Sequence, residues 1–290
     1  MISVLFLLLS LVYGAERKKS YSIDDNATNG NIRPIIHTYF ERIPLERRFT
    51  DMTDDDDDSL LEFWKASWQA AGWDPVILGL DDVKRHPNYD EYEKELQKLR
   101  LDDFSLISFR RYLAMATTGG WMCDYDAFPI RDFRAEAREF SKKSGIFYFH
   151  GIVTATLASA ERQSWELAFR ALLDDAKLQL DSTSTGYNHW SDVLGIYSLM
   201  RNNTFKGKYL RLVMPANMIM TSSPITSEFC TKRQFRKKQF VIHFNPQSMI
   251  LGESNVNHRL PKHRVIVAKD VIPRFVNACN ISLQVPYNSV

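Results

Sequence analysis

The chain has 290 residues, and its 37 lysines and arginines nearly balance its 35 aspartates and glutamates, which gives a formal net charge of +2. Hydrophobic residues make up 44% of the chain, a share typical of a folded globular protein and too high for a disordered or collagen-like chain. The near-neutral charge gives no reason to expect a nucleic-acid partner, because nucleic-acid-binding proteins carry a basic excess or stripe.

Residues 1–14 form an apolar run that is followed by Arg17, Lys18 and Lys19. The run is shorter than the ~20 apolar residues that a spanning helix needs, and it ends in small residues, so it predicts a cleaved signal peptide. A retained membrane anchor is the alternative, and cleavage would leave no transmembrane span. Residues 15–30 are polar and are interpreted as a stem. The protein is therefore expected in the lumen of the secretory pathway (endoplasmic reticulum or Golgi) or outside the cell.

Residues 31–290 are expected to form one α/β domain, because strand and helix patterns alternate without a long linker. A buried strand is predicted at 34–40, an acidic loop at Asp54–Asp58, and a helix from a capping box at Ser59 and Glu62 to residue 71. The later elements follow from the same periodicities: a strand at 73–78, helices at 90–100, 105–118 and 165–180, and strands at 209–214, 240–244 and 265–268.

Several large or sulfur-containing side chains are expected to have structural roles only. Trp64, Trp68 and Trp121 are interpreted as core residues, because aromatic side chains dominate burial. The odd count of three cysteines allows at most one internal disulfide, for which Cys230 with Cys279 is the favoured pair. Cys123 lies in an apolar stretch and is expected to be free and buried.

The most informative stretch is a helix that stops at Gly119-Gly120, followed by a short apolar strand and by the carboxylates Asp124 and Asp126. Side chains two residues apart in an extended segment point the same way, so the two aspartates can converge on one cation. Asp-x-Asp alone is weak evidence. The arginine-bearing helix and the paired glycines before it make the functional interpretation favoured over a solvated turn.

Arg111-Tyr112 and the run from Gly119 to Asp126 resemble the glycosyltransferases of family 32, which include yeast α-mannosyltransferases and, distantly, the clostridial toxin glucosyltransferases. The opening run 33–40 is similar to the family's first strand, and the run 241–249 is similar to its closing His-x-x-x-x-Ser-Trp. The resemblance spans about residues 31–250. It implies a GT-A type fold, a Rossmann-like mixed sheet flanked by helices that binds a nucleotide sugar. It also implies retaining sugar transfer with a divalent metal, usually Mn²⁺.

The resemblance and the chemistry of the residue types together assign roles in the metal and leaving-group site. Asp126 is the expected direct metal ligand, and Asp124 is expected to bridge the metal and the donor's ribose or sugar. Arg111 can reach donor oxygens as a planar fork, because its helix presents it away from the apolar face. His243, at the end of an apolar strand, is expected to complete the metal shell as a neutral imidazole.

The remaining assignments concern the two substrates. Phe40 takes the position of an aromatic near the nucleotide base, and Ser248 takes the place of the family's closing serine as a donor-binding residue. His189 and Asp192 are candidates for handling the acceptor. The basic cluster within 232–238 is interpreted as a solvated edge.

The expected function is therefore metal-dependent transfer of a hexose from a UDP- or GDP-sugar to a glycan or glycoprotein acceptor. Ser108 and Met249 stand where the family has aspartate and tryptophan, and they favour the alternative of a catalytically silent sugar-binding module. A haloacid dehalogenase-type phosphatase also uses Asp-x-Asp, but Asp126 is followed by Ala127-Phe128 rather than by that family's pattern.

Overall fold

The computed structural model describes residues 33–48, 50–135, 137, 147–151, 157–180, 188–201, 210–218, 240–246, 249, 260–281 and 287. The predicted signal peptide (1–14) and stem (15–30), the basic cluster at 232–238, Cys230 and Ser248 lie outside these residues. Among the other cysteines, Cys123 is free and buried, as expected, and Cys279 forms a disulfide.

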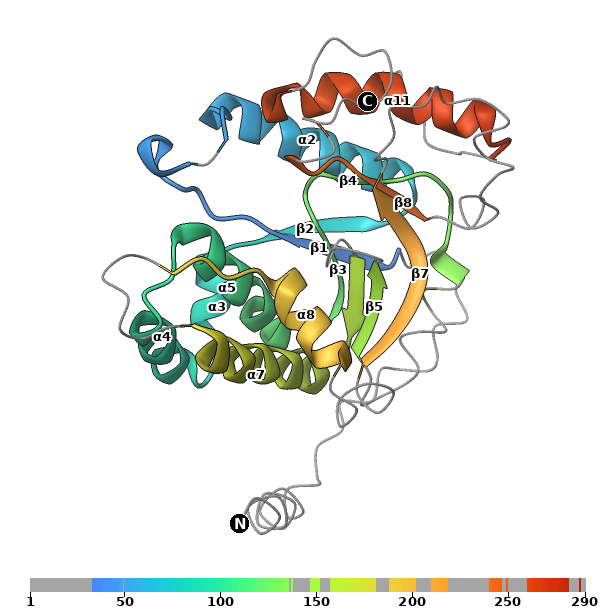
Figure 1. The fold of residues 1–290 in the computed structure, drawn as a ribbon. Coiled ribbons are helices and arrows are strands. Elements are labelled where there is room, and N and C mark those ends of the chain that lie inside the picture. The colour runs from blue at the N-terminus through green and yellow to red at the C-terminus, as the bar shows by residue number, and fades with distance from the viewer. Residues whose placement is uncertain are drawn as a thin grey trace. The chain divides into compact units, whose positions relative to one another are not determined.

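The described strands form one mixed sheet in the order β2-β1-β3-β6-β5-β7-β8-β4 (Figure 1). Strand β1 (Ile35–Tyr39) is parallel to β2 (Asp74–Leu78) and to β3 (Gly120–Cys123). Antiparallel pairs join β3 to β6 and β4 to β8, whereas β7 runs parallel to both β5 and β8. The bounds of these strands are β4 (Ala127–Pro129), β5 (Phe147–Gly151), β6 (Leu157–Ala160), β7 (Leu210–Met218) and β8 (Val241–His243).

Helices cover both faces of the sheet, so the chain forms a single α/β domain, as predicted (Figure 1). Helices α2 (Asp54–Ala70) and α11 (Arg264–Ala278) cover one face. The other face is covered by α3 (Leu80–Lys84), α4 (Tyr89–Lys98), α5 (Asp103–Thr118), α7 (Arg162–Gln179) and α8 (Asp192–Arg201). Two short 3-10 helices are η1 (Leu45–Arg47) and η3 (Pro261–His263). Within the described residues no helix is both long and apolar enough to span a membrane.

The alternation of side chains along β3 divides the core into two layers. Trp121 and Cys123 pack into the layer under α2 and α11, and Met122 between them packs into the layer under α5 and α7. Trp64 and Trp68 are fully buried in the first layer, so the prediction that the tryptophans are core residues is confirmed. Burial of large aromatic side chains on both faces anchors β3, the strand that leads to the two aspartates.

The prediction of an acidic loop at Asp54–Asp58 is wrong, because these residues form the first turns of α2. Thr53 is the N-cap: its side-chain oxygen accepts a hydrogen bond from Asp56 N at 3.2 Å, and the Asp56 carboxylate accepts one from Thr53 N at 2.8 Å. The capping box therefore lies at Thr53, not at Ser59. Negative charge in the first turn of a helix is stabilised by the free N–H groups and the helix dipole, so a run of aspartates suits this position.

The predicted strand at 265–268 is also wrong, because this segment begins α11. Its β-branched residues favour a strand locally. However, buried residues recur at Arg264, Val267, Ala268, Val271 and Ile272, which is the spacing of one helix face packed on a sheet. The other predicted helices and strands are present with shifted ends. The sequence patterns did not identify β4, β5, β6, α3 and α8.

Candidate metal centre

A sharp reversal of the chain leads from α5 into β3. Gly119 ends the helix with a backbone φ of 74°, and Gly120 follows with a φ of 89°. Both values lie in the left-handed region that favours glycine. A Cβ on Gly119 would also lie 3.1 Å from Cγ of Arg162. The paired glycines therefore permit a turn that side chains would obstruct.

The two aspartates lie in a tight turn between β3 and β4. Ala127 N donates to the Asp124 carbonyl at 3.0 Å, so Asp124–Ala127 is a hydrogen-bonded turn. The sequence pattern predicts that the aspartates converge because the segment is extended. The segment is a turn, so this reason is wrong. Convergence comes instead from the turn and from the neighbouring strand, because Ala127 pairs with His243 and Phe244 N donates to the Asp126 carbonyl at 2.9 Å.

Asp124, Asp126 and His243 bring their ligand atoms to within 4.8 Å of one another. His243 Nε2 lies 2.9 Å from Asp126 Oδ1 and 3.5 Å from Asp124 Oδ2. Asp126 and His243 are buried, and Asp124 is partly exposed. The prediction that these three side chains reach a common point is confirmed, although His243 lies on β8, distant in sequence from the turn that carries the two aspartates.

Arg111 connects this cluster to α8. Its Nη1 lies 2.7 Å from Asp124 Oδ1, and its Nη2 contacts Asp192 Oδ2. The hydroxyl of Tyr112 donates to the same Asp192 oxygen at 3.0 Å. Asp192 was expected to handle the acceptor, but it is a buried partner of Arg111. No local sequence signal pointed to this pairing, because the two residues lie 81 positions apart.

A second arginine, Arg264, reaches the cluster from the start of α11. Its Nη2 lies 3.5 Å from Asp126 Oδ2, and its Nε donates to the Phe244 carbonyl at 2.9 Å. Arg264 is buried, which is unusual for an arginine unless it is paired. Sequence reasoning missed it because it assigned this segment to a strand.

The two carboxylates differ in their pKa values. Burial raises the pKa of Asp124, even though the guanidinium of Arg111 and the imidazole of His243 oppose the effect. Burial acts in the same direction on Asp126, but His243 and Arg264 outweigh it and hold the pKa of Asp126 below its ordinary value. Burial lowers the pKa of His243, but Asp126 and Asp124 outweigh it, so the pKa of this imidazole is raised.

The structure places the predicted base-binding residue beside the turn. The ring of Phe40 meets the ring of Tyr125, which lies between the two aspartates, edge to face with 5.5 Å between centroids. The guanidinium of Arg42 lies 5.9 Å from the centroid of Phe40. Phe40 is partly exposed, so its ring can contact a ligand.

The predicted site residue His189 and the two departures from the family pattern, Ser108 and Met249, have structural surroundings. The hydroxyl of Ser108 donates to the Phe104 carbonyl of its own helix at 2.9 Å. His189 Nδ1 lies 2.7 Å from Asp102 Oδ2, and its ring stacks on the exposed Phe104 near the start of α5. Met249, in the place of the family's tryptophan, is buried in the core layer under α2 and α11.

The donor set fits a divalent cation of the Mn²⁺ type. Carboxylate oxygens suit hard cations such as Mg²⁺ and Mn²⁺, and an imidazole nitrogen shifts the preference towards transition metals. A cation held by all three side chains would keep coordination positions open for water or for oxygens of a bound molecule. Because a metal needs the neutral imidazole, its binding would release the proton of His243.

Comparison with known proteins adds one partial match. A family model described as a domain of unknown function (DUF8765) matches residues 26–148. This segment contains Phe40, Arg111, Asp124 and Asp126, whereas His243 lies beyond it. No curated protein matches the chain. Residues 26–148 are therefore similar to a domain of unknown function.

Proposed function

We propose that this protein is a metal-dependent glycosyltransferase of the GT-A type. In this proposal it transfers a hexose from a UDP- or GDP-sugar to a glycan or glycoprotein acceptor in the secretory pathway. The observation that carries the proposal is the convergence of Asp124, Asp126 and His243 beside Arg111. The resemblance to family 32 supports it, because the matching motif supplies the two aspartates and Arg111.

The mixed α/β sheet also supports the proposal. The turn that carries Asp124 and Asp126 follows β3, whose neighbour β1 ends next to Phe40, so these strands bring a metal site and an exposed aromatic ring together. A nucleotide that stacks on Phe40 would place its diphosphate towards the metal ligands. Stacking on an aromatic ring accepts either uracil or guanine, since every base has a π face.

Each residue of the centre has a chemical task in this reaction. Asp124 Oδ2, Asp126 Oδ1 and His243 Nε2 would hold the cation, which supplies positive charge to the diphosphate leaving group. Arg111 holds Asp124 in place through Nη1, and its Nε–H has no hydrogen-bond partner within the described part of the chain. Its Nη atoms contact Asp124 and Asp192, so in this proposal Arg111 acts on the donor's oxygens through its positive charge beside the metal ligands.

Calorimetric titration of the secreted domain with UDP and with GDP, with and without Mn²⁺, tests the proposal. We expect one nucleotide to bind only with Mn²⁺, and Asp126→Ala and His243→Ala to abolish that binding. Glu166→Gln is the control: this carboxylate is partly buried and pairs with Arg170 on α7, across the sheet from α11. The control should bind the nucleotide as the native protein does.

The outcomes separate the alternatives. Mn²⁺-dependent nucleotide binding, followed by transfer or hydrolysis of the matching nucleotide sugar, supports the glycosyltransferase. Nucleotide or sugar binding without any turnover across a panel of donors and acceptors would favour a silent sugar-binding module. Phosphate release from a phosphomonoester, with no nucleotide binding, would favour a phosphatase and contradict the proposal.

A further inference from the structure

The two aspartates of the metal centre share one arrangement. In each carboxylate, one oxygen faces an arginine from a flanking helix and the other faces His243. Asp124 uses Oδ1 for Arg111 of α5 and Oδ2 for His243 Nε2. Asp126 uses Oδ2 for Arg264 of α11 and Oδ1 for His243 Nε2. The oxygens that remain for a cation are therefore selected by the two arginines.

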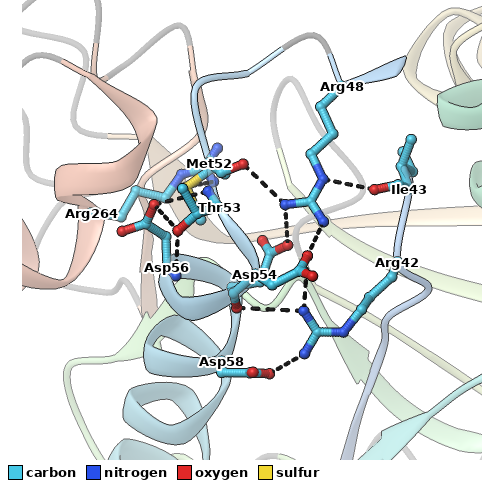
Figure 2. A network of polar contacts seen from close by, with 10 residues as sticks. Arg42, Ile43, Arg48, Met52, Thr53, Asp54, Asp56, Asp58 and Arg264 are labelled. Carbon is cyan, nitrogen blue, oxygen red and sulfur yellow. Dashed lines mark hydrogen bonds and ion pairs between the residues drawn. The ribbon is translucent and has the colours of Figure 1, made fainter. Parts of the chain in front are cut away.

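Arg264 is fixed on both sides of its guanidinium. Its Nε donates to the Phe244 carbonyl at 2.9 Å, and Phe244 N donates to the Asp126 carbonyl at 2.9 Å. Its Nη1 lies 4.0 Å from Sδ of Met52, in the segment that leads into α2 (Figure 2). With 3% of its surface exposed, Arg264 has little freedom to turn towards a substrate.

We propose that Arg264 is a positioning residue for metal binding. It holds Oδ2 of Asp126, so that Oδ1 stays directed at the point shared with His243 and Asp124. This inference rests on the proposed metal site, and it extends that site to the first residue of α11. Partners that orient metal-binding carboxylates commonly change metal affinity about 10- to 100-fold when they are altered.

Positioning and charge have opposite expected effects, which makes the role testable. The positive charge of Arg264 by itself repels a cation, so an arginine that acted only through charge would weaken metal binding, and its removal would strengthen it. An arginine that orients Asp126 should do the reverse. Arg264→Lys keeps the charge but cannot hold the Phe244 carbonyl and Asp126 with one planar fork.

Mn²⁺ affinity of the full chain, measured by calorimetry without nucleotide, provides the test. Arg110→Lys is the control, because the Arg110 side chain is only 11% exposed and pairs with Glu93 at 2.7 Å, on α5, which covers the face of the sheet opposite α11. Near-ultraviolet circular dichroism establishes that each variant is folded at the temperature of the titration. Arg264→Met, which also removes the charge, is measured alongside.

We expect Arg264→Lys to raise the Kd for Mn²⁺ about tenfold and Arg110→Lys to leave it unchanged. An unchanged Kd in folded Arg264→Lys would overturn the positioning role, as would tighter binding by Arg264→Met. An equal loss in Arg110→Lys would also overturn it, because the effect would then be general to paired, largely buried arginines. If Arg264→Met does not fold, the lysine variant decides. Absence of Mn²⁺ binding by the native chain would instead overturn the metal site itself.

Discussion

The two aspartates of the candidate metal centre differ in burial, partners and pKa. The side chain of Asp124 is 19% exposed and pairs with Arg111, which lies 13 residues earlier on the adjoining helix. The side chain of Asp126 is 8% exposed and pairs with His243 and Arg264, both distant in sequence. Burial raises the pKa of Asp124, whereas the two cationic partners of Asp126 outweigh burial and lower its pKa.

In the proposed metal site, this difference assigns the two aspartates different roles. Asp126 has a lowered pKa and is oriented from two sides, so it would be the permanent metal ligand. Asp124 lies nearer to solvent and shares its arginine with Asp192, so it would be the ligand that adjusts to a bound molecule.

The largest effect is expected from removal of the Asp126 carboxylate. Asp126→Ala should lower Mn²⁺ affinity by more than about 100-fold, because it removes a metal ligand and leaves Arg264 and His243 without their shared carboxylate. Asp124→Ala should cost less. Calorimetric titration with Mn²⁺ compares the two variants, and a greater loss in Asp124→Ala would reverse the assigned roles.

The next effect concerns Arg111, which contacts both Asp124 and Asp192. Arg111→Lys should lower Mn²⁺-dependent nucleotide affinity by about 10- to 100-fold, because a lysine cannot contact Asp124 and Asp192 at the same time. Asp192→Asn keeps the shape but removes one charge, so its effect should be smaller. Nucleotide titration at saturating Mn²⁺ measures both. Native-like affinity in Arg111→Lys would show that a point charge is sufficient.

A pH titration separates the ligand that changes its protonation from those that do not. The raised pKa of His243 means that this imidazole is protonated below that pKa, and a metal must displace the proton. Mn²⁺ affinity should therefore fall about tenfold per pH unit below the folded-state pKa of His243 and be independent of His243 above it. Calorimetry at several pH values, with His243→Gln as control, checks this. If Mn²⁺ affinity still falls steeply with decreasing pH in His243→Gln, the group that titrates would be Asp124 rather than His243.

The smallest effect should be on nucleotide affinity alone. Phe40→Leu should weaken nucleotide binding about tenfold, within the range for loss of a base–aromatic stack, and leave Mn²⁺ affinity unchanged. Tyr125→Phe keeps the ring that meets Phe40 and removes only a hydroxyl, whose pKa burial raises to about 12. It should bind nucleotide normally. Loss of Mn²⁺ binding in Phe40→Leu would place the ring in the metal site rather than beside it.

Local sequence patterns identified both aspartates of the site. The helix ending at Gly119, the reversal at Gly119-Gly120 and the short strand before Asp124 follow from spacing and from the conformational freedom of glycine. The burial of Trp64 and Trp68 also follows from composition and helical spacing. These features depend on neighbours within a few residues, so the sequence by itself determined them.

The charged partners of the two aspartates depended on tertiary structure. The start of α2 at Thr53 and the helical state of residues 265–268 depend on which face packs against the sheet, and that choice overrides local propensity. The contacts of Asp192 with Arg111 and of Arg264 with Asp126 depend on the order of strands and the positions of α8 and α11. Such pairings join residues distant in sequence, and no local period encodes them. The sequence therefore determined which residues carry the chemistry of the turn, and only the packing of the sheet and its flanking helices decided which charges face them.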